Sequence, residues 1–364
     1  MEIAGSDLEE LLRMGFDPSG FERVWRDYVS GRWDRELVIE ASRLAPPPVE
    51  RFTVLPADPG PERDRLVARG TAAIENGEVG AIVLNGGMAT RFGGVVKGTV
   101  EVVEGRSFID LKLSQIRSVC RDLPVYLMNS HATHAATLEH LASIPAAREH
   151  TYTFLQTVAP RVTRDGELVR DAGGSVSTSG MGHGDTLTSF RGGGLDAFLD
   201  LDGRILMVSN VDNLGAVLDP LLVGIHLEQG RSVSVEVARR SPSDRGGMPV
   251  QMDGTVRLLE GLRWPRGIDD QGYETFNTNT FLIDAGVFQD PPQLDAYPVR
   301  KQVDGRTVIQ FERILGEVTH FLDTTFVVVP AHGDGSRFIP VKRREDLEER
   351  RDRIVACLAP WGVL

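Results

Sequence analysis

The sequence has few cysteines, no basic leader and no long apolar run. Cys120 and Cys357 are its only cysteines, they lie far apart, and no histidine cluster flanks them. Neither a disulfide framework nor a zinc site is therefore indicated, and a reducing compartment is expected. The first residues, MEIAGSD, lack the basic and apolar regions of a signal peptide, and no stretch approaches the length of a membrane helix. We therefore expect a cytoplasmic protein that does not enter a membrane.

Positive charge is also scarce. The chain has 40 Lys and Arg residues against 52 Asp and Glu residues, which gives a formal net charge of −12 at pH 7. A general nucleic-acid binder would carry a basic field, so nucleic acid is not expected as a partner. The hydrophobic content of 41% and the charged content of 25% are ordinary for a globular protein. Residues that bind phosphate must therefore be local exceptions on an acidic surface.

The most informative stretch joins an apolar run to a glycine-rich turn. Ala81 to Leu84 are typical of a buried parallel strand, and Asn85-Gly86-Gly87 follow at once. Backbone N–H groups in such a turn form an anion-binding concavity. Arg91 and Lys97 add positive charge, so the stretch suits a nucleoside triphosphate. Its spacing matches neither the dinucleotide fingerprint nor the P-loop, and a glycine-rich turn with surface charges is the structural alternative.

The first sixty residues predict an accessory helical lobe. Two amphipathic runs occur, and the second carries Phe21 and Trp25 at helical spacing. Proline-rich segments at 46–48 and 56–61 end both periodicities and predict an extended linker. We therefore expect an N-terminal helical lobe and linker over 1–61, whose function the residues do not indicate.

From residue 62 onward, helical and strand patterns alternate. This alternation predicts a largely parallel sheet flanked by helices, in which ligands bind at the carboxyl ends of the strands. Polar residues should then follow the strands, and they do. They are Asn129-Ser130-His131, Gln156, Ser209-Asn210-Val211-Asp212-Asn213 and Arg239-Arg240-Ser241.

Several short motifs, in order, resemble the UTP–glucose-1-phosphate uridylyltransferase (UDP-glucose pyrophosphorylase) family of the eukaryote-like type. They are Leu84-Asn85-Gly86-Gly87, Leu127-Met128-Asn129-Ser130, Gly182-His183-Gly184-Asp185, Ser209-Asn210-Val211-Asp212-Asn213, Phe276-Asn277-Thr278-Asn279, Val308-Ile309-Gln310 and Arg337-Phe338-Ile339-Pro340-Val341-Lys342. The resemblance covers 81–345. It implies a Rossmann-like, GT-A-type α/β nucleotidyltransferase fold with a mixed, mainly parallel sheet flanked by helices. The catalytic domain is expected over 62–345 and a C-terminal helix or tail over 346–364.

The sequence also departs from the family pattern. The third loop glycine is Ala89, and the family's G-P-K-S continuation is one residue shorter here, without its proline and with Gly98 after Lys97. Arg240-Ser241 replace a family lysine and threonine. The chain ends soon after Lys342, so the C-terminal β-helix that many relatives use for assembly is not expected. The oligomeric state stays open, with a homodimer among the arrangements.

These departures leave two substrate pairs open. The family default is UTP with glucose 1-phosphate. The alternative is GTP, or another nucleotide, with a cyclitol 1-phosphate such as valienol 1-phosphate in antibiotic biosynthesis, as for a valienol-1-phosphate guanylyltransferase. Either reaction releases pyrophosphate. The attacking phosphate is already ionised near neutral pH, so the site must align and screen two anions and needs no catalytic base.

The resemblance and the strand-end positions together assign roles to individual residues. Asp212 is the predicted Mg²⁺ ligand, because carboxylate and phosphate oxygens suit that ion, and an aspartate that caps the next helix is the structural alternative. The predicted catalytic cations are Arg91 and Lys97 at the triphosphate, Lys342 at the α-phosphate or pyrophosphate, and Arg240 at the sugar phosphate. The expected nucleotide-binding residues are Leu84, Asn85, Gly86, Gly87, Met128, Gln156 and Gly182. Those expected around the sugar and its phosphate are His183, Asn210, Glu236, Asn277 and Asn279.

Two other classes of function fit the sequence less well. A non-catalytic sugar-nucleotide sensor would lose the metal ligand or the lysines, but Asp212, Lys97 and Lys342 are all present. A glycosyltransferase of similar fold would need a D-x-D metal motif. Asp200-Leu201-Asp202 has that spacing, but Gly203 follows it and a strand comes next, so it is predicted to be a turn.

Overall fold

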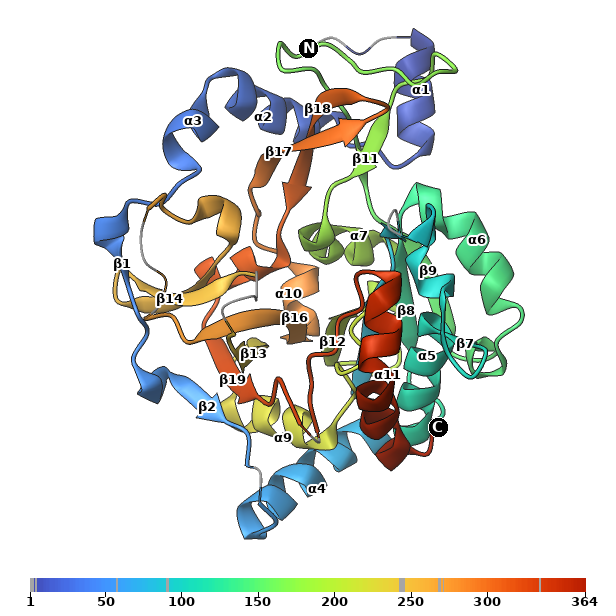
Figure 1. The fold of residues 1–364 in the computed structure, drawn as a ribbon, viewed down its shortest axis with the longest axis vertical. Helices are drawn as coiled ribbons and strands as arrows, with labels where there is room; N and C mark the ends of the chain where they lie inside the picture. The colour runs from blue at the N-terminus through green and yellow to red at the C-terminus, as the bar shows by residue number, and fades with distance from the viewer. Residues whose placement is uncertain are drawn as a thin grey trace.

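The computed structural model spans the chain (Figure 1). It describes all residues except 1, 2, 4, 57, 90, 91, 242–245, 268, 269, 271 and 334, together with the side chain of residue 89. Arg91, one of the predicted cations, therefore lies outside the described residues.

An eight-stranded mixed sheet forms the centre of the molecule, in the order β2-β19-β13-β16-β12-β3-β8-β9. The strands are β2 (Phe52–Val54), β3 (Val79–Leu84), β8 (Val125–Asn129), β9 (Thr151–Leu155), β12 (Ile205–Asn210), β13 (Val233–Arg239), β16 (Thr275–Asp284) and β19 (Thr324–Val329). The neighbouring pairs are parallel except for β12–β16 and β13–β16. The expected mixed, mainly parallel sheet is confirmed, and β3, β8, β9 and β12 end at one edge.

Helices cover both faces of this sheet because alternate strand residues point to opposite sides. In β3, Ala81 and Val83 join the apolar core beneath α4, α5, α9 and α11, whereas Ile82 and Leu84 join the core beneath α7, α8 and α10. The helices are α4 (Pro61–Glu75), α5 (Phe108–Val119), α6 (His131–Leu141), α7 (Thr186–Gly193), α8 (Leu195–Leu199), α9 (Pro220–Gln229), α10 (Ala285–Gln289) and α11 (Arg344–Leu358). The inner strands β3, β8 and β12 are buried and largely apolar on both sides, as a doubly covered sheet requires.

The N-terminal helices α1 (Gly5–Arg13), α2 (Pro18–Val29) and α3 (Arg32–Glu36) pack on a distant part of the chain. Their partners are the ribbon of β17 (Ala296–Val303) and β18 (Arg306–Arg313), with β10 (Val158–Pro160) and β11 (Thr178–Gly180) (Figure 1). Phe21 and Phe311 make an edge-to-face contact with their ring centroids 5.8 Å apart. The lobe thus shares an apolar cluster with this ribbon.

The segment expected to be a linker takes part in the sheets. Phe52–Val54 is the edge strand β2 of the central sheet, and β1 (Leu44–Ala45) pairs with β14 (Met248–Met252) beside β15 (Thr255–Leu259). Proline limits these strands to short edges, which is where it is tolerated. The segment is extended, as predicted, but it is held by β-pairing at both of its strands.

The remaining short elements connect the layers. They are strands β4 (Met88–Ala89), β5 (Val95–Val96), β6 (Glu101–Val103) and β7 (Arg106–Ser107), and 3-10 helices Ala41–Arg43, Val49–Arg51, Lys97–Thr99, Pro145–Ala147, His183–Asp185, Gly261–Arg263, Leu315–His320 and Ala359–Trp361. Asp200-Leu201-Asp202 forms a turn before β12, as expected. Within the described part of the chain, no helix has both the length and the apolar composition that crossing a membrane requires.

Candidate active site

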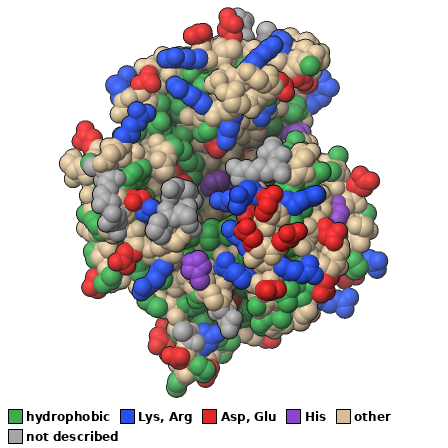
Figure 2. Space-filling model, in the orientation of Figure 1, with side chains coloured by type: hydrophobic (Ala, Val, Ile, Leu, Met, Phe, Trp, Pro, Cys, Tyr) green, Lys and Arg blue, Asp and Glu red, His purple; other side chains and the backbone are tan. Residues whose placement is uncertain are grey.

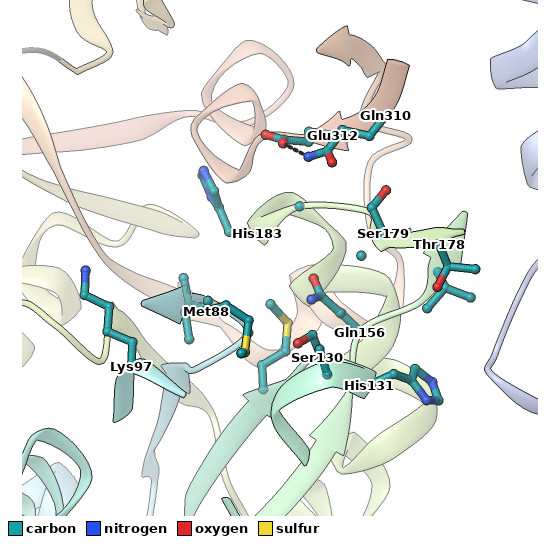
Figure 3. A pocket seen from close by; sticks show the side chains of 18 of the residues that line it. Met88, Lys97, Ser130, His131, Gln156, Thr178, Ser179, His183, Gln310 and Glu312 are labelled. Carbon is teal, nitrogen blue, oxygen red and sulfur yellow. Dashed lines mark hydrogen bonds between the residues drawn. The ribbon is translucent and has the colours of Figure 1, made fainter. Parts of the chain in front are cut away.

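Two cavities adjoin each other at the carboxyl ends of β3, β8, β9 and β12. The larger has a volume of about 640 Å³ and the smaller about 240 Å³. His183, Asn210 and Asp212 line both. In the larger cavity Gln156 and Ser130 lie across from Gln310 and Glu312 of β18 (Figure 3). Lys and Arg side chains are interspersed with Asp and Glu side chains over the face seen in Figure 2.

Gln156 forms part of the wall of the larger cavity, directly after β9. A Cβ atom at Gly86 would lie 2.8 Å from its Nε2 atom, and one at Gly180 would lie 2.2 Å from the same atom. A Cβ atom at either position would therefore displace the Gln156 amide, which lies close to two stretches of backbone. A primary amide can donate and accept hydrogen bonds, as a base edge requires. Of the other predicted nucleotide-binding residues, those that also line this cavity are Leu84, Gly86, Gly87, Met128 and Gly182.

Asn85 lies beneath the glycine turn and lines neither cavity. Its Nδ2 donates to Asn129 Oδ1 at 2.8 Å and to Thr137 Oγ1 at 2.9 Å, which ties the end of β3 to β8 and α6. A Cβ atom at Gly98 would lie 2.2 Å from Asn85 Oδ1 and 2.7 Å from Ile109. The departure to glycine after Lys97 therefore fits the close packing of this chain.

Lys97 and Asp212 form an ion pair where the two cavities meet. The β4–β5 hairpin delivers Lys97, whose Nζ donates to Asp212 Oδ2. The backbone of Asp212 is fixed in turn, because its carbonyl accepts from Val341 N at 3.1 Å. Asp212 does not cap the next helix, since Asp219 caps α9. The structural alternative for Asp212 is thus excluded.

The described residues contain no group of three or more His, Cys, Asp or Glu side chains that could enclose a metal. Mg²⁺ at nucleotide sites is usually held by one or two carboxylates plus substrate phosphates and waters, so a complete protein cage is not required. A single carboxylate that faces both cavities fits this kind of donor set.

His183 is a neutral hydrogen-bonding group in this site. His183 is half-buried, and desolvation of its ring lowers its pKa to about 4. Leu315 N donates to His183 Nδ1 at 3.2 Å, so the proton of the neutral ring resides on Nε2. The turn that carries it is anchored by the fully buried Asp185, which accepts from Thr157 N at 2.7 Å and from Arg313 Nη1 at 2.9 Å. His183 can therefore donate to an oxygen without adding a charge.

The smaller cavity is lined by amides together with Lys342. Asn279 Nδ2 donates to Asn210 Oδ1 at 2.9 Å, and Asn279 N donates to Asn277 Oδ1 at 2.8 Å. Among the described atoms, the buried Asn279 Oδ1 has no hydrogen-bond partner. A buried acceptor without a partner is costly unless a ligand supplies a donor. A sugar hydroxyl is such a donor.

Glu260 also lines the smaller cavity, and the sequence analysis did not identify it. Burial and the nearby Glu317 raise its pKa to about 7, and a hydrogen bond from Asn277 opposes that shift. Glu260 directly follows β15, so the strand-end rule extended to this side sheet would have found it. Further residues of the larger cavity without an assigned role include Met88, Ser130, His131, Arg161, Ser179, Lys301, Gln310 and Glu312.

Two other predicted residues line neither cavity. Both oxygens of the buried Glu236 accept from Arg337, each at 2.7 Å. Arg240 is mostly buried, and its guanidinium donates to the carboxylate and the carbonyl of Asp270. The structure thus brings most of the predicted site together and places Asn85, Glu236 and Arg240 in the layer around it.

The model of the family described as UTP–glucose-1-phosphate uridylyltransferase matches residues 46–353. The chain belongs to this family. The resemblance seen in the motifs is thereby confirmed.

Individual relatives agree with the family assignment. UTP–glucose-1-phosphate uridylyltransferase of Hordeum vulgare is 28% identical over 363 residues, covering 91% of this chain and 72% of the relative. That of Saccharomyces cerevisiae is 33% identical over 295 residues, covering 74% of this chain and 58% of the relative.

Solved structures share the fold. A uridine diphosphate N-acetylglucosamine pyrophosphorylase from Trypanosoma brucei superposes with a TM-score of 0.79 at 19% identity, covering 97% of this chain and 80% of that one. A UDP-glucose pyrophosphorylase mutant from Leishmania major gives 0.74 at 24% identity, covering 95% and 79%. At these identities the likeness extends to the fold alone.

Proposed function

We propose that this protein is a nucleotidyltransferase that converts UTP and glucose 1-phosphate to UDP-glucose and pyrophosphate. Family membership supports the class of reaction and this substrate pair. The observation that carries the proposal is the meeting of two cavities at His183, Asn210 and Asp212. Two substrates can then bind from opposite sides with their phosphates side by side.

The two cavities suit different halves of the reaction. The larger one, with Gln156 held between Gly86 and Gly180, takes the nucleotide. The smaller one takes the sugar, whose hydroxyls donate to Asn279 Oδ1 and contact Asn277 and Glu260. The phosphates then meet beside Lys97, Lys342 and the uncharged donor His183.

Catalysis consists of alignment and charge screening. A phosphate oxygen of glucose 1-phosphate attacks the α-phosphorus of UTP, a new P–O bond forms, and the bond to the pyrophosphate oxygen breaks. Lys342 and Lys97 stabilise the charge that develops on the phosphates, and the walls hold the two reacting groups in line. Mg²⁺ bound to Asp212 would screen the phosphate charge. No side chain has to remove a proton.

The remaining assignments belong to the same proposal. Within it, we assign Arg91 to the triphosphate and Arg240 to the sugar phosphate, for which Arg240 would first have to release Asp270. Asn85 and Glu236 act through the residues they hold. The two described cysteines are free, which supports a reducing, cytoplasmic location, and a homodimer is kept as the assembly to be tested.

A panel of substrates tests the proposal. Pyrophosphate release would be measured with each of four nucleoside triphosphates against glucose 1-phosphate, N-acetylglucosamine 1-phosphate and valienol 1-phosphate. We expect the highest kcat/KM for UTP with glucose 1-phosphate. A preference for GTP with the cyclitol phosphate would replace the substrates and keep the reaction. Absence of release with every pair would overturn the reaction class.

A further inference from the structure

The ion pair between Lys97 and Asp212 occupies the position that the proposed mechanism gives to a metal. Lys97 Nζ donates to Asp212 Oδ2, and the two side chains are only 18% and 17% exposed. The other described carboxylates lining the cavities are Glu312, which accepts from Gln310 Nε2, and Glu260, which the Asn277 side chain contacts. Asp212 alone among them faces both cavities, and an ammonium group already neutralises it.

The two partners differ in how firmly they are held. Asp212 sits between β12 and the 339–341 segment, bonded through its own carbonyl to Val341 N and through its neighbour Asn213, whose Oδ1 accepts from Ile339 N at 2.8 Å. Lys97 is held at its backbone, where its N–H donates to Gly87 O at 3.3 Å. Its ammonium group lies at the end of a flexible four-carbon stem. The backbone that carries the short Asp212 side chain is thus fixed, whereas the ammonium group of Lys97 is able to move.

We infer that Lys97 keeps the divalent cation off Asp212 until the nucleotide binds, so that metal and nucleotide enter the site together. The inference rests on the proposed function. A metal and an ammonium group on one carboxylate repel each other, and both compete for the same oxygens. A triphosphate in the larger cavity gives Lys97 a second anionic partner, to which it can transfer. Asp212 then regains its full negative charge as the metal arrives.

The exchange makes the two ligands cooperate. By linkage, nucleotide raises the affinity for metal by the same factor by which metal raises the affinity for nucleotide. A metal ion alone then binds weakly, because Lys97 already occupies the carboxylate of Asp212. When the nucleotide binds and takes Lys97, the metal neutralises that carboxylate in its place. The joint entry of metal and nucleotide thus follows from Lys97, which can pair either with Asp212 or with the triphosphate.

The test measures binding of Mn²⁺ alone, by the electron paramagnetic resonance signal of the free ion, without nucleotide or activity. The proteins are the wild type, Lys97→Met, Asp212→Asn and Lys97→Met combined with Asp212→Asn. Lys301→Met is the matched control, because Lys301 lines the same cavity but pairs with Glu312 at 3.5 Å. We expect Lys97→Met to bind Mn²⁺ about tenfold more tightly than the wild type, within the usual range of coupling. Lys301→Met should match the wild type, and the double variant should lose the gain.

The outcomes separate the inference from the function beneath it. Equal, Asp212-dependent affinities in the wild type and Lys97→Met would overturn the inference and leave Asp212 as the metal ligand. If Asp212→Asn weakens Mn²⁺ binding neither in the wild type nor in Lys97→Met, both the inference and the proposed role of Asp212 as the metal ligand are overturned. A gain in Lys301→Met as large as that in Lys97→Met would show that cavity charge in general is responsible, which also overturns the inference. Thermal unfolding of Lys97→Met checks that the variant is folded.

Discussion

Asp212 is the residue on which the proposed reaction depends most. Asp212→Asn keeps the shape and the contact to Val341, which uses backbone atoms, but removes the charge. We expect kcat to fall by about 100-fold or more while the melting temperature changes little. Asp200→Asn, in the exposed turn before β12, is the control and should retain full activity. Near-normal turnover in Asp212→Asn would remove the metal role.

Glu236 shows where a residue-level prediction depends on contacts that no motif displays. The family resemblance placed Glu236 near the sugar, whereas the structure pairs it with the buried Arg337. The carboxylates of Glu236 and Asp219 raise the pKa of Arg337, although burial alone would lower it. Removing the Glu236 charge leaves the buried guanidinium with the more distant carboxylate of Asp219, 3.6 Å away. We expect Glu236→Gln to lower the free energy of unfolding by about 3–5 kcal/mol in urea titrations. Unchanged stability with a raised KM for glucose 1-phosphate would instead indicate a direct sugar contact.

Glu260 should give the sugar side of the site a pH dependence near neutrality. Its pKa is about 7 in the folded protein against an ordinary 4.5, so between these values the folded state holds a proton that the unfolded chain releases. The contribution of Glu260 to the free energy of unfolding therefore falls as pH rises from 4.5 to 7, and stays low above 7. The ionised carboxylate accepts from a sugar hydroxyl, so KM for the sugar phosphate should also fall through pH 7. In Glu260→Gln, with the same substrate, both trends should flatten.

At the scale of single elements, the hairpin and short helix that carry Lys97 are tightly packed. Gly98→Ser restores the residue typical of the family but brings Cβ within 2.2 Å of Asn85 Oδ1 and 2.7 Å of Ile109. We expect a loss of about 1–3 kcal/mol in unfolding free energy and a displaced Lys97, seen as a raised KM for UTP. Gly192→Ala, near the end of α7 with open space around its Cβ position, is the control and should not lower stability, because alanine favours the helix over glycine. A Gly98→Ser protein as stable as the wild type would contradict the packing argument.

The elements that could be predicted from the sequence are those with a local signal. Apolar runs followed by polar residues located β3, β8, β9 and β12, and these strand ends bring Gln156 and Asp212 to one edge. Gln310 and Glu312 are different, because they reach the cavity only through the pairing of β17 with β18 and the packing of that ribbon. Periodicity within a strand predicts which faces are apolar but not what lies across a cavity. The far wall of the site therefore required the structure.

At the scale of the whole molecule, the N-terminal lobe is joined to the active site through the β17–β18 ribbon. The sequence predicted the helices of the lobe but not its contact with the ribbon. That contact joins Phe21 to Phe311, which are 290 positions apart, and no local pattern indicates such a pairing. The division at 1–61, 62–345 and 346–364 remains a prediction. The shared apolar cluster and the edge strand β2 show that the lobe and the segment after it pack on the body of the protein.

Because Phe311 lies between Gln310 and Glu312, the packing of the lobe should position the far wall of the larger cavity. Phe311 is fully buried, and the ring of Phe21 packs edge-on against it. Phe21→Ala removes that support and should lower the free energy of unfolding by about 3–5 kcal/mol, as large-to-small core changes do.

We also expect Phe21→Ala to raise KM for UTP several-fold while KM for glucose 1-phosphate stays nearly constant, because only the larger cavity includes β18. Val29→Ala, at an exposed position of the same helix, should change neither value. Lower stability with an unchanged KM for UTP would mean that the lobe stabilises the fold without shaping the nucleotide site, since the ribbon would then hold Gln310 and Glu312 unaided.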